Sequence, residues 1–163
     1  MNIRFAEEKD IGGIDALLYQ VASVHAAGRP DLFIDGEKKY TDDELVRIIT
    51  NERGTRPIFV YTDTDDTNGT ERVRGYAFCM LEDHADAHVL TPIRTLYIDD
   101  LCVDEGCRNQ HIGTALFEHA KAYAKSCGCY NLTLNVWACN ENARKFYERM
   151  GMQVQKTGME SIL

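Results

Sequence analysis

Apolar and polar residues alternate with two different spacings along the chain, and these spacings predict its helices and strands. Alternation over residues 2–6 predicts a first strand. Apolar residues then recur at helical spacing over residues 11–24, with Asp10 as the expected N-cap. A second helix is predicted after Thr41, because Thr41 and Glu44 have the spacing of a capping box and an apolar stripe follows them.

The rest of the chain continues the pattern with short apolar runs and two more helical stripes. Strands are predicted over residues 57–61, 73–81, 95–103 and 132–137, and helices over residues 112–128 and 140–151. The tail, residues 152–163, can make one or two short strands. The predicted order is β-α-α-β-β-β-α-β-α-β, an α+β fold in which about four helices flank one mixed sheet. We expect a single domain over residues 1–163.

Composition and charge exclude several classes of protein. The net charge of -8 argues against nucleic acid as a partner, because phosphates require a basic surface. It is compatible with a cationic substrate or simply with solubility. No stretch approaches the run of about 20 apolar residues that a membrane helix needs. The N-terminus lacks the pattern of a secretory signal, so we expect a cytoplasmic protein with no membrane partner.

The six cysteines do not form a metal-binding pattern. None belongs to a Cys-x-x-Cys pair, and no pair of histidines stands nearby at ligand spacing. Several lie within apolar runs, where cysteine behaves as a small hydrophobic residue. We therefore expect reduced thiols and no metal.

The junction between the buried strand at 95–103 and the helix that follows has the features of an anion site. A helix start offers unpaired N–H groups and the positive end of the helix dipole. Gly113, in the first turn, is expected to leave no side chain between the backbone and a ligand. The Walker and Rossmann glycine patterns are both absent.

Two segments resemble motifs of the GNAT acetyltransferase superfamily. Arg108 and Gly113 match the pyrophosphate loop Arg/Gln-x-x-Gly-x-Gly/Ala, and the following Ala115-Leu116 also matches, although His111 stands where the family usually has its first glycine. Residues 140–152 resemble the downstream segment Asn-x-x-Ala-x-x-Phe-Tyr-x-x-x-Gly-Phe, with methionine in place of the last phenylalanine. The run from Tyr97 to Asp100 is also similar to the Tyr-Leu-Glu-Asp run of polyamine acetyltransferases in this superfamily.

The resemblance implies acetyl-CoA as the acetyl donor. The backbone of one segment is expected to hold the pantetheine arm at a splay between strands, and it comprises Leu101, Cys102 and Val103. An N–H group at or near Val103 would polarise the thioester carbonyl. The pyrophosphate would be bound by Arg108, Asn109, Gln110, His111, Ile112, Gly113 and Thr114. Asn140 is either an N-cap or a hydrogen-bond partner of the cofactor arm.

Three residues are the catalytic candidates. The resemblance makes Tyr147 the general acid that protonates the departing thiolate, the alternative being a core aromatic. Asp99 is the expected base for the acceptor amine, directly or through water, and Asp100 is the other candidate; a structural role, such as an ion pair or a loop cap, is the alternative. Strict alternation would place Asp99, and not Asp100, on the face of Leu101 and Val103.

These expectations define one main function and two alternatives. The main one is direct transfer of an acetyl group to the primary amine of a small cationic substrate. The alternatives are acetylation of a protein or peptide, and an acyl-CoA-binding module without turnover. Residues 158–163 could pair as an edge strand, so a homodimer is also compatible with the sequence.

Overall fold

The computed structural model describes residues 2–64, 69–85 and 88–163. Two short 3-10 turns lie at Glu8–Asp10 and Glu105–Cys107. The longer elements are β1 Asn2–Phe5, α1 Ile11–Gly28, α2 Asp42–Asn51, β2 Ile58–Thr64, β3 Glu71–Asp83, β4 Arg94–Val103, α3 Ile112–Ser126, β5 Asn131–Leu134 and α4 Glu141–Arg149. This confirms the predicted α+β class and the element order as far as the last helix.

The strands form one mixed sheet in the order β1-β2-β3-β4-β5. The first four strands pair antiparallel, and β4 pairs parallel with β5. A parallel pair needs a crossover connection, and α3 supplies it. The start of α3 is therefore brought to the end of β4, where the binding site was predicted.

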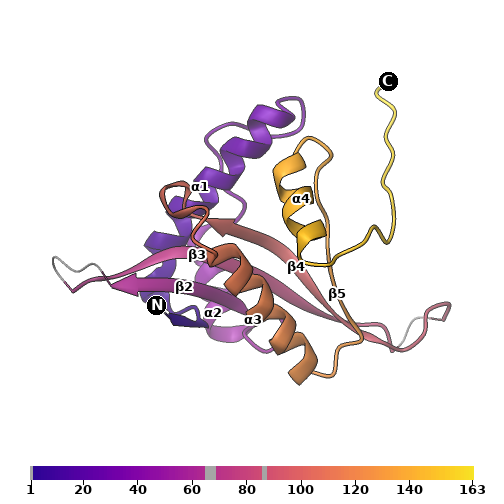
Figure 1. The fold of residues 1–163 in the computed structure, drawn as a ribbon, viewed down its shortest axis with the longest axis horizontal. Coiled ribbons are helices and arrows are strands. Elements are labelled where there is room, and N and C mark those ends of the chain that lie inside the picture. The colour runs from indigo at the N-terminus through magenta and orange to yellow at the C-terminus, as the bar shows by residue number, and fades with distance from the viewer. Residues whose placement is uncertain (1, 65–68, 86–87) are drawn as a thin grey trace.

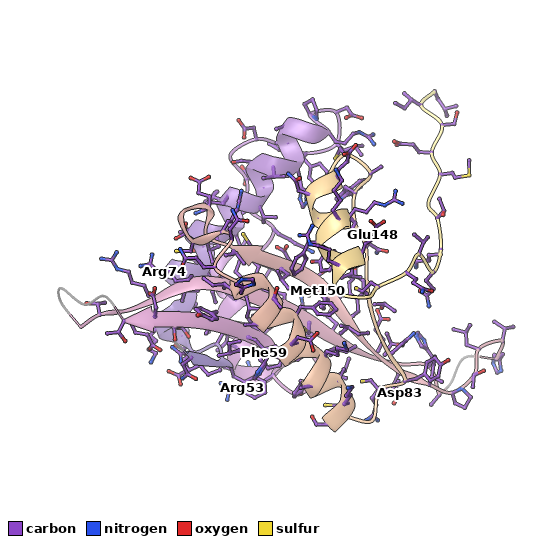
Figure 2. The ribbon with its side chains drawn as sticks, in the orientation of Figure 1. Arg53, Phe59, Arg74, Asp83, Glu148 and Met150 are labelled. Atoms are coloured by element: carbon purple, nitrogen blue, oxygen red, sulfur yellow. The ribbon has the colours of Figure 1, made fainter. Side chains whose placement is uncertain are left out.

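Helices cover both faces of the sheet (Figure 1), so each face has its own hydrophobic cluster. On one side α1 and α2 pack on β-strand residues such as Tyr76 and Phe78. On the other side α3 packs on Phe59 and its neighbours, and α4 lies against the same cluster. Figure 2 shows Phe59 in the sheet beneath α3 and Met150 at the end of α4. This two-sided burial explains why β4 has apolar residues on both faces.

The helix starts follow local side-chain chemistry, with one correction. The predicted capping box opens α2, since Thr41 accepts a hydrogen bond from the Glu44 amide and Glu44 accepts one from the Thr41 amide. Asp10 is the residue before α1, but its carboxylate does not cap that helix. It pairs instead with Arg4 at 2.6 Å and accepts from the Glu7 amide, which ties β1 to the start of α1.

The end of the chain departs from the prediction. The strand predicted over residues 132–137 ends at Leu134, and Trp137 packs edge-on against Phe33 at 5.2 Å. Met152 still packs against the cluster beneath α3, but after it the chain is an extended segment outside the layers (Figure 1), and no strand forms there among the described residues. Its apolar side chains, such as Val154 and Ile162, are exposed. None of the described helices has the length and apolar character needed to cross a membrane.

Candidate active site

The strands β4 and β5 run side by side over only part of their length. Their pairing runs from Thr95 to Ile98 on β4, and β5 ends opposite Ile98. Beyond that point β4 continues to Val103, paired with β3 alone among the described residues. The segment Leu101–Val103 therefore has an open backbone edge. An extended ligand arm can add to such an edge as a further strand.

The loop after β4 leads to the uncapped start of α3. Asp104 caps the 3-10 turn by accepting from the Gly106 amide at 3.1 Å. The first hydrogen bond of the long helix runs from the Ala115 amide to the His111 carbonyl, at 3.0 Å. The amides before Ala115 in the first turn thus lack acceptors within the helix, and His111 gives no side-chain cap. These outward N–H groups fit a diphosphate.

His111 adopts the backbone conformation that glycine favours. Its φ is 60° and its ψ is 11°, which is left-handed, and Asn109 two residues earlier has φ 64°. Histidine and asparagine are among the residues enriched in this region. Histidine therefore takes at this position a backbone conformation that glycine also adopts readily. Arg108, Gln110 and His111 are exposed, as a loop that binds phosphate requires.

The bare side of Gly113 lies between α4 and β4. A Cβ atom on Gly113 would lie 3.5 Å from Phe146 and 3.6 Å from Val103, and both are ordinary contacts. The bare side of Gly113 therefore faces α4 and β4 and not the exposed loop. Gly75 on β3 is sterically required, because a Cβ atom there would lie 2.9 Å from the Cys102 carbonyl oxygen. It lets α3 approach the sheet closely.

A β-bulge in β4 places both acidic residues on the same side of the sheet. Phe78 pairs with Asp100 and Cys79 pairs with Ile98, so Asp99 is the extra residue. Asp99 and Asp100 both contact tyrosines from the cluster beneath α1 and α2. The prediction that Asp99 shares the face of Leu101 and Val103 is therefore wrong. Alternation fails there because a bulge inserts one residue into the period of two.

Asp99 is held by two residues that precede α2. The Lys39 ammonium group donates to the Asp99 carboxylate at 2.8 Å, and the Tyr40 hydroxyl donates to its other oxygen. Tyr40 in turn stacks on Phe78 with ring centroids 5.1 Å apart. Neither Lys39 nor Tyr40 was identified from the sequence. The one feature of the sequence that could have drawn attention to Tyr40 is its position directly before the capping residue Thr41.

Asp100 is held by one tyrosine in a more apolar setting. The Tyr76 hydroxyl donates to its carboxylate at 2.8 Å. Desolvation raises the pKa of Asp100 to about 6, against the lowering effect of the Tyr76 hydrogen bond and of the Lys39 charge. A carboxyl with this pKa is largely ionised at neutral pH yet is a stronger base than an exposed one. Sequence reasoning also missed Tyr76, since it reads as an ordinary core aromatic.

Tyr147 lies on α4 with its ring against Phe117 and Phe146, at centroid distances of 6.1 and 5.0 Å. Desolvation, followed by the negative charge of Asp100, raises the pKa of its phenol well above the ordinary value. The Tyr147 hydroxyl makes no hydrogen bond to any residue that the structure describes. A partly buried phenol that keeps its proton and has no partner among the described residues can donate to a ligand.

Two further candidates have clear structural roles. Asn140 is the N-cap of α4, because its side-chain oxygen accepts from the Ala143 amide at 3.1 Å. Cys102 is buried, and desolvation raises the pKa of its thiol to about 12. A thiol that holds its proton so strongly is a poor nucleophile. No group of three or more metal-binding side chains occurs within the described part of the chain.

Comparisons with known proteins agree with this geometry. The family model described as acetyltransferase (GNAT) family matches residues 23–152. No curated protein matches the sequence. The tetramutant of the BH1408 protein from Bacillus halodurans is 30% identical over the full length of both chains, with a TM-score of 0.90.

Two more distant structures share the fold. A ribosomal-protein-alanine N-acetyltransferase from Brucella melitensis is 16% identical, covers both chains fully and has a TM-score of 0.69. An aminoglycoside N-acetyltransferase in complex with CoA is 12% identical, with a TM-score of 0.67 over 99% of this chain and 98% of that one. The open edge of β4, the uncapped start of α3 and the matching family model lead to one conclusion: this chain is an acyltransferase that belongs to the GNAT acetyltransferase family.

Proposed function

We propose that this enzyme transfers an acetyl group from acetyl-CoA directly to the primary amine of a small cationic molecule. The observation that carries the proposal is the bulge at Asp99, which turns two adjacent carboxylates to the α1–α2 side of β4. An alkyl ammonium group is attracted to such a pair, and it must lose a proton before it can attack a carbonyl. The earlier likeness to polyamine acetyltransferases remains a prediction.

The residues that would hold acetyl-CoA follow from the geometry above. The open edge at Leu101–Val103 fits the pantetheine arm, and the outward N–H groups at the start of α3 fit the diphosphate. Arg108 supplies a positive charge in the same loop. When bound, acetyl-CoA supplies an activated acetyl group. An amide N–H near Val103 is the proposed donor to its carbonyl oxygen.

We assign the proton transfers to Asp100 and Tyr147. An alkyl amine with a pKa near about 10 is on the order of 0.1% neutral at pH 7, so a base is needed. Asp100 accepts that proton, directly or through a water molecule, because desolvation raises its pKa to about 6. Asp99 holds the ammonium group in place. Tyr147 keeps its proton at neutral pH and donates it to the departing sulfur.

A panel of acceptors tests the proposal by release of free CoA thiol from acetyl-CoA. The panel contains 1,4-diaminobutane, spermidine, an amino acid amide, an aminoglycoside and a peptide with an N-terminal alanine. We expect turnover with the small cationic amines to exceed turnover with the peptide. Turnover with the peptide alone would replace the proposal with protein acetylation. Calorimetric binding of CoA without turnover of any amine would indicate a binding module.

A further inference from the structure

Lys39 places an ammonium group of the protein itself on the carboxylate that we assign to the acceptor. Its Nζ atom lies 2.8 Å from the Asp99 carboxylate and 3.3 Å from the Asp99 carbonyl oxygen, and 5.6 Å from the centre of the Tyr40 ring. A carboxylate, a carbonyl oxygen and an aromatic face together make a binding site for a primary ammonium group. The site is thus already filled by a group of the same chemical class as the proposed acceptor.

The parts of this site differ in how firmly they are held. The Asp99 side chain is 11% exposed, whereas the Lys39 side chain is 45% exposed. Asp99 is fixed by the bulge and by the Tyr40 hydroxyl, and Tyr40 is fixed by stacking on Phe78. Lys39 lies in the non-helical stretch before α2, and none of the three contacts that fix Asp99 and Tyr40 involves its side chain. The carboxylate and the ring would remain in place for another cation.

We infer that Lys39 is a tethered competitor that occupies the ammonium subsite on Asp99, and that a cationic acceptor binds by displacing it. This inference rests on the proposed function for the identity of the acceptor, but the subsite itself can be tested by binding alone. An ion pair with one exposed partner contributes little free energy. Its removal should therefore strengthen binding of an external ammonium by about threefold to fivefold.

Lys38 provides a matched control. It is the adjacent residue and carries the same charge, but its ammonium group pairs with Asp15, at 2.8 Å, and with Asp42. Lys38→Met therefore removes one positive charge nearby without vacating Asp99. Both variants remove one positive charge, so any general increase in attraction for cations should be equal in Lys38→Met and Lys39→Met. Only Lys39→Met also opens the subsite on Asp99.

The experiment is calorimetric titration of 1,4-diaminobutane into the CoA-bound protein, in which no transfer can occur. We expect Lys39→Met to bind the diamine about threefold to fivefold more tightly than wild type or Lys38→Met. Lys39→Arg should remain close to wild type, because its guanidinium can still pair with Asp99. Thermal unfolding of all variants establishes that they are folded.

The outcomes separate this inference from the proposed function. Equal affinities in Lys39→Met and Lys38→Met would overturn the inference, as would no binding to Lys39→Met. If Lys39→Met binds the diamine more tightly but no amine in the acceptor panel releases CoA thiol, the subsite stands and the proposed function fails. If amines turn over but the two variants have equal affinities, the function stands and the competitor role of Lys39 fails.

Discussion

Replacing Asp100 by asparagine tests whether the fold keeps a desolvated carboxylate at the expense of stability. Desolvation raises the pKa of Asp100 from 3.8 to about 6. In the unfolded chain the Asp100 carboxyl loses its proton near its ordinary pKa of 3.8, whereas in the folded protein it keeps the proton until about pH 6. In that pH window the unfolded state is increasingly favoured, so the free energy of unfolding falls as the pH rises. One pKa unit corresponds to about 1.36 kcal/mol. Above pH 6, ionised Asp100 therefore lowers the free energy of unfolding by up to about 3 kcal/mol.

The assay is urea unfolding of wild type and Asp100→Asn at several values between pH 4 and pH 8. The stability of the variant relative to wild type should increase as the pH rises from about 4 to about 6 and stay constant above that. Asp99→Asn is the control. It loses the contacts of Asp99 with Lys39 and Tyr40, and we expect it to be less stable than wild type at pH 7. A difference between wild type and Asp100→Asn that does not change with pH would refute the argument.

The same variant has a kinetic consequence. If Asp100 is the base, the turnover of wild type rises as the pH increases through about 6, because the ionised carboxylate is the active form. Asp100→Asn should lose this rise and about 100-fold of its turnover number, while its affinity for CoA is unchanged. A rise that persists in the variant would assign the pH dependence to another group.

Substitutions at four further positions test separate parts of the site. Tyr147→Phe should lower the turnover number about 100-fold with unchanged CoA affinity by calorimetry, and a kinetically silent change would contradict the acid role. His111→Gly should raise the free energy of unfolding by up to about 1 kcal/mol in urea titrations because it relieves the left-handed backbone, whereas His111→Val should lower it. Gly75→Ala should lower the free energy of unfolding by about 1–3 kcal/mol, because its Cβ atom clashes with the Cys102 carbonyl. Gly113→Ala makes only ordinary contacts, so the same urea titration should show almost no change.

Periodicity alone was sufficient to predict the elements that have a regular buried face. The helical stripes became α1, α2, α3 and α4, and the apolar run before Asp104 became the strand buried on both faces. The capping box at Thr41 was predicted correctly because both of its hydrogen bonds are local. The binding loop was located through the resemblance of its residues to a known family, since helix-start geometry is common to many anion sites.

The errors arose where distant residues decide the local structure. Trp137 continues the alternation of β5, yet it leaves the sheet because its ring packs on Phe33 from the segment after α1. The tail has apolar residues at strand-like spacing, but no neighbouring strand of this chain pairs with it in the described structure. Lys39 could not be placed near Asp99 from the sequence, because sixty residues separate them.

The bulge at Asp99 explains how two neighbouring carboxylates can act on the same amine, with Asp99 binding the ammonium group and Asp100 accepting its proton. Desolvation is the main cause of the raised pKa of Asp100; the positive charge of Lys39 lowers this pKa and the negative charge of Asp99 raises it. An acceptor ammonium that displaces Lys39 would replace one positive charge with another, so Asp100 would stay ionised while the acceptor binds. Once the amine transfers its proton, that positive charge disappears and the pKa of Asp100 rises, which favours retention of the proton while the neutral amine reacts. Regular alternation would direct the two carboxylates to opposite faces and would uncouple these events.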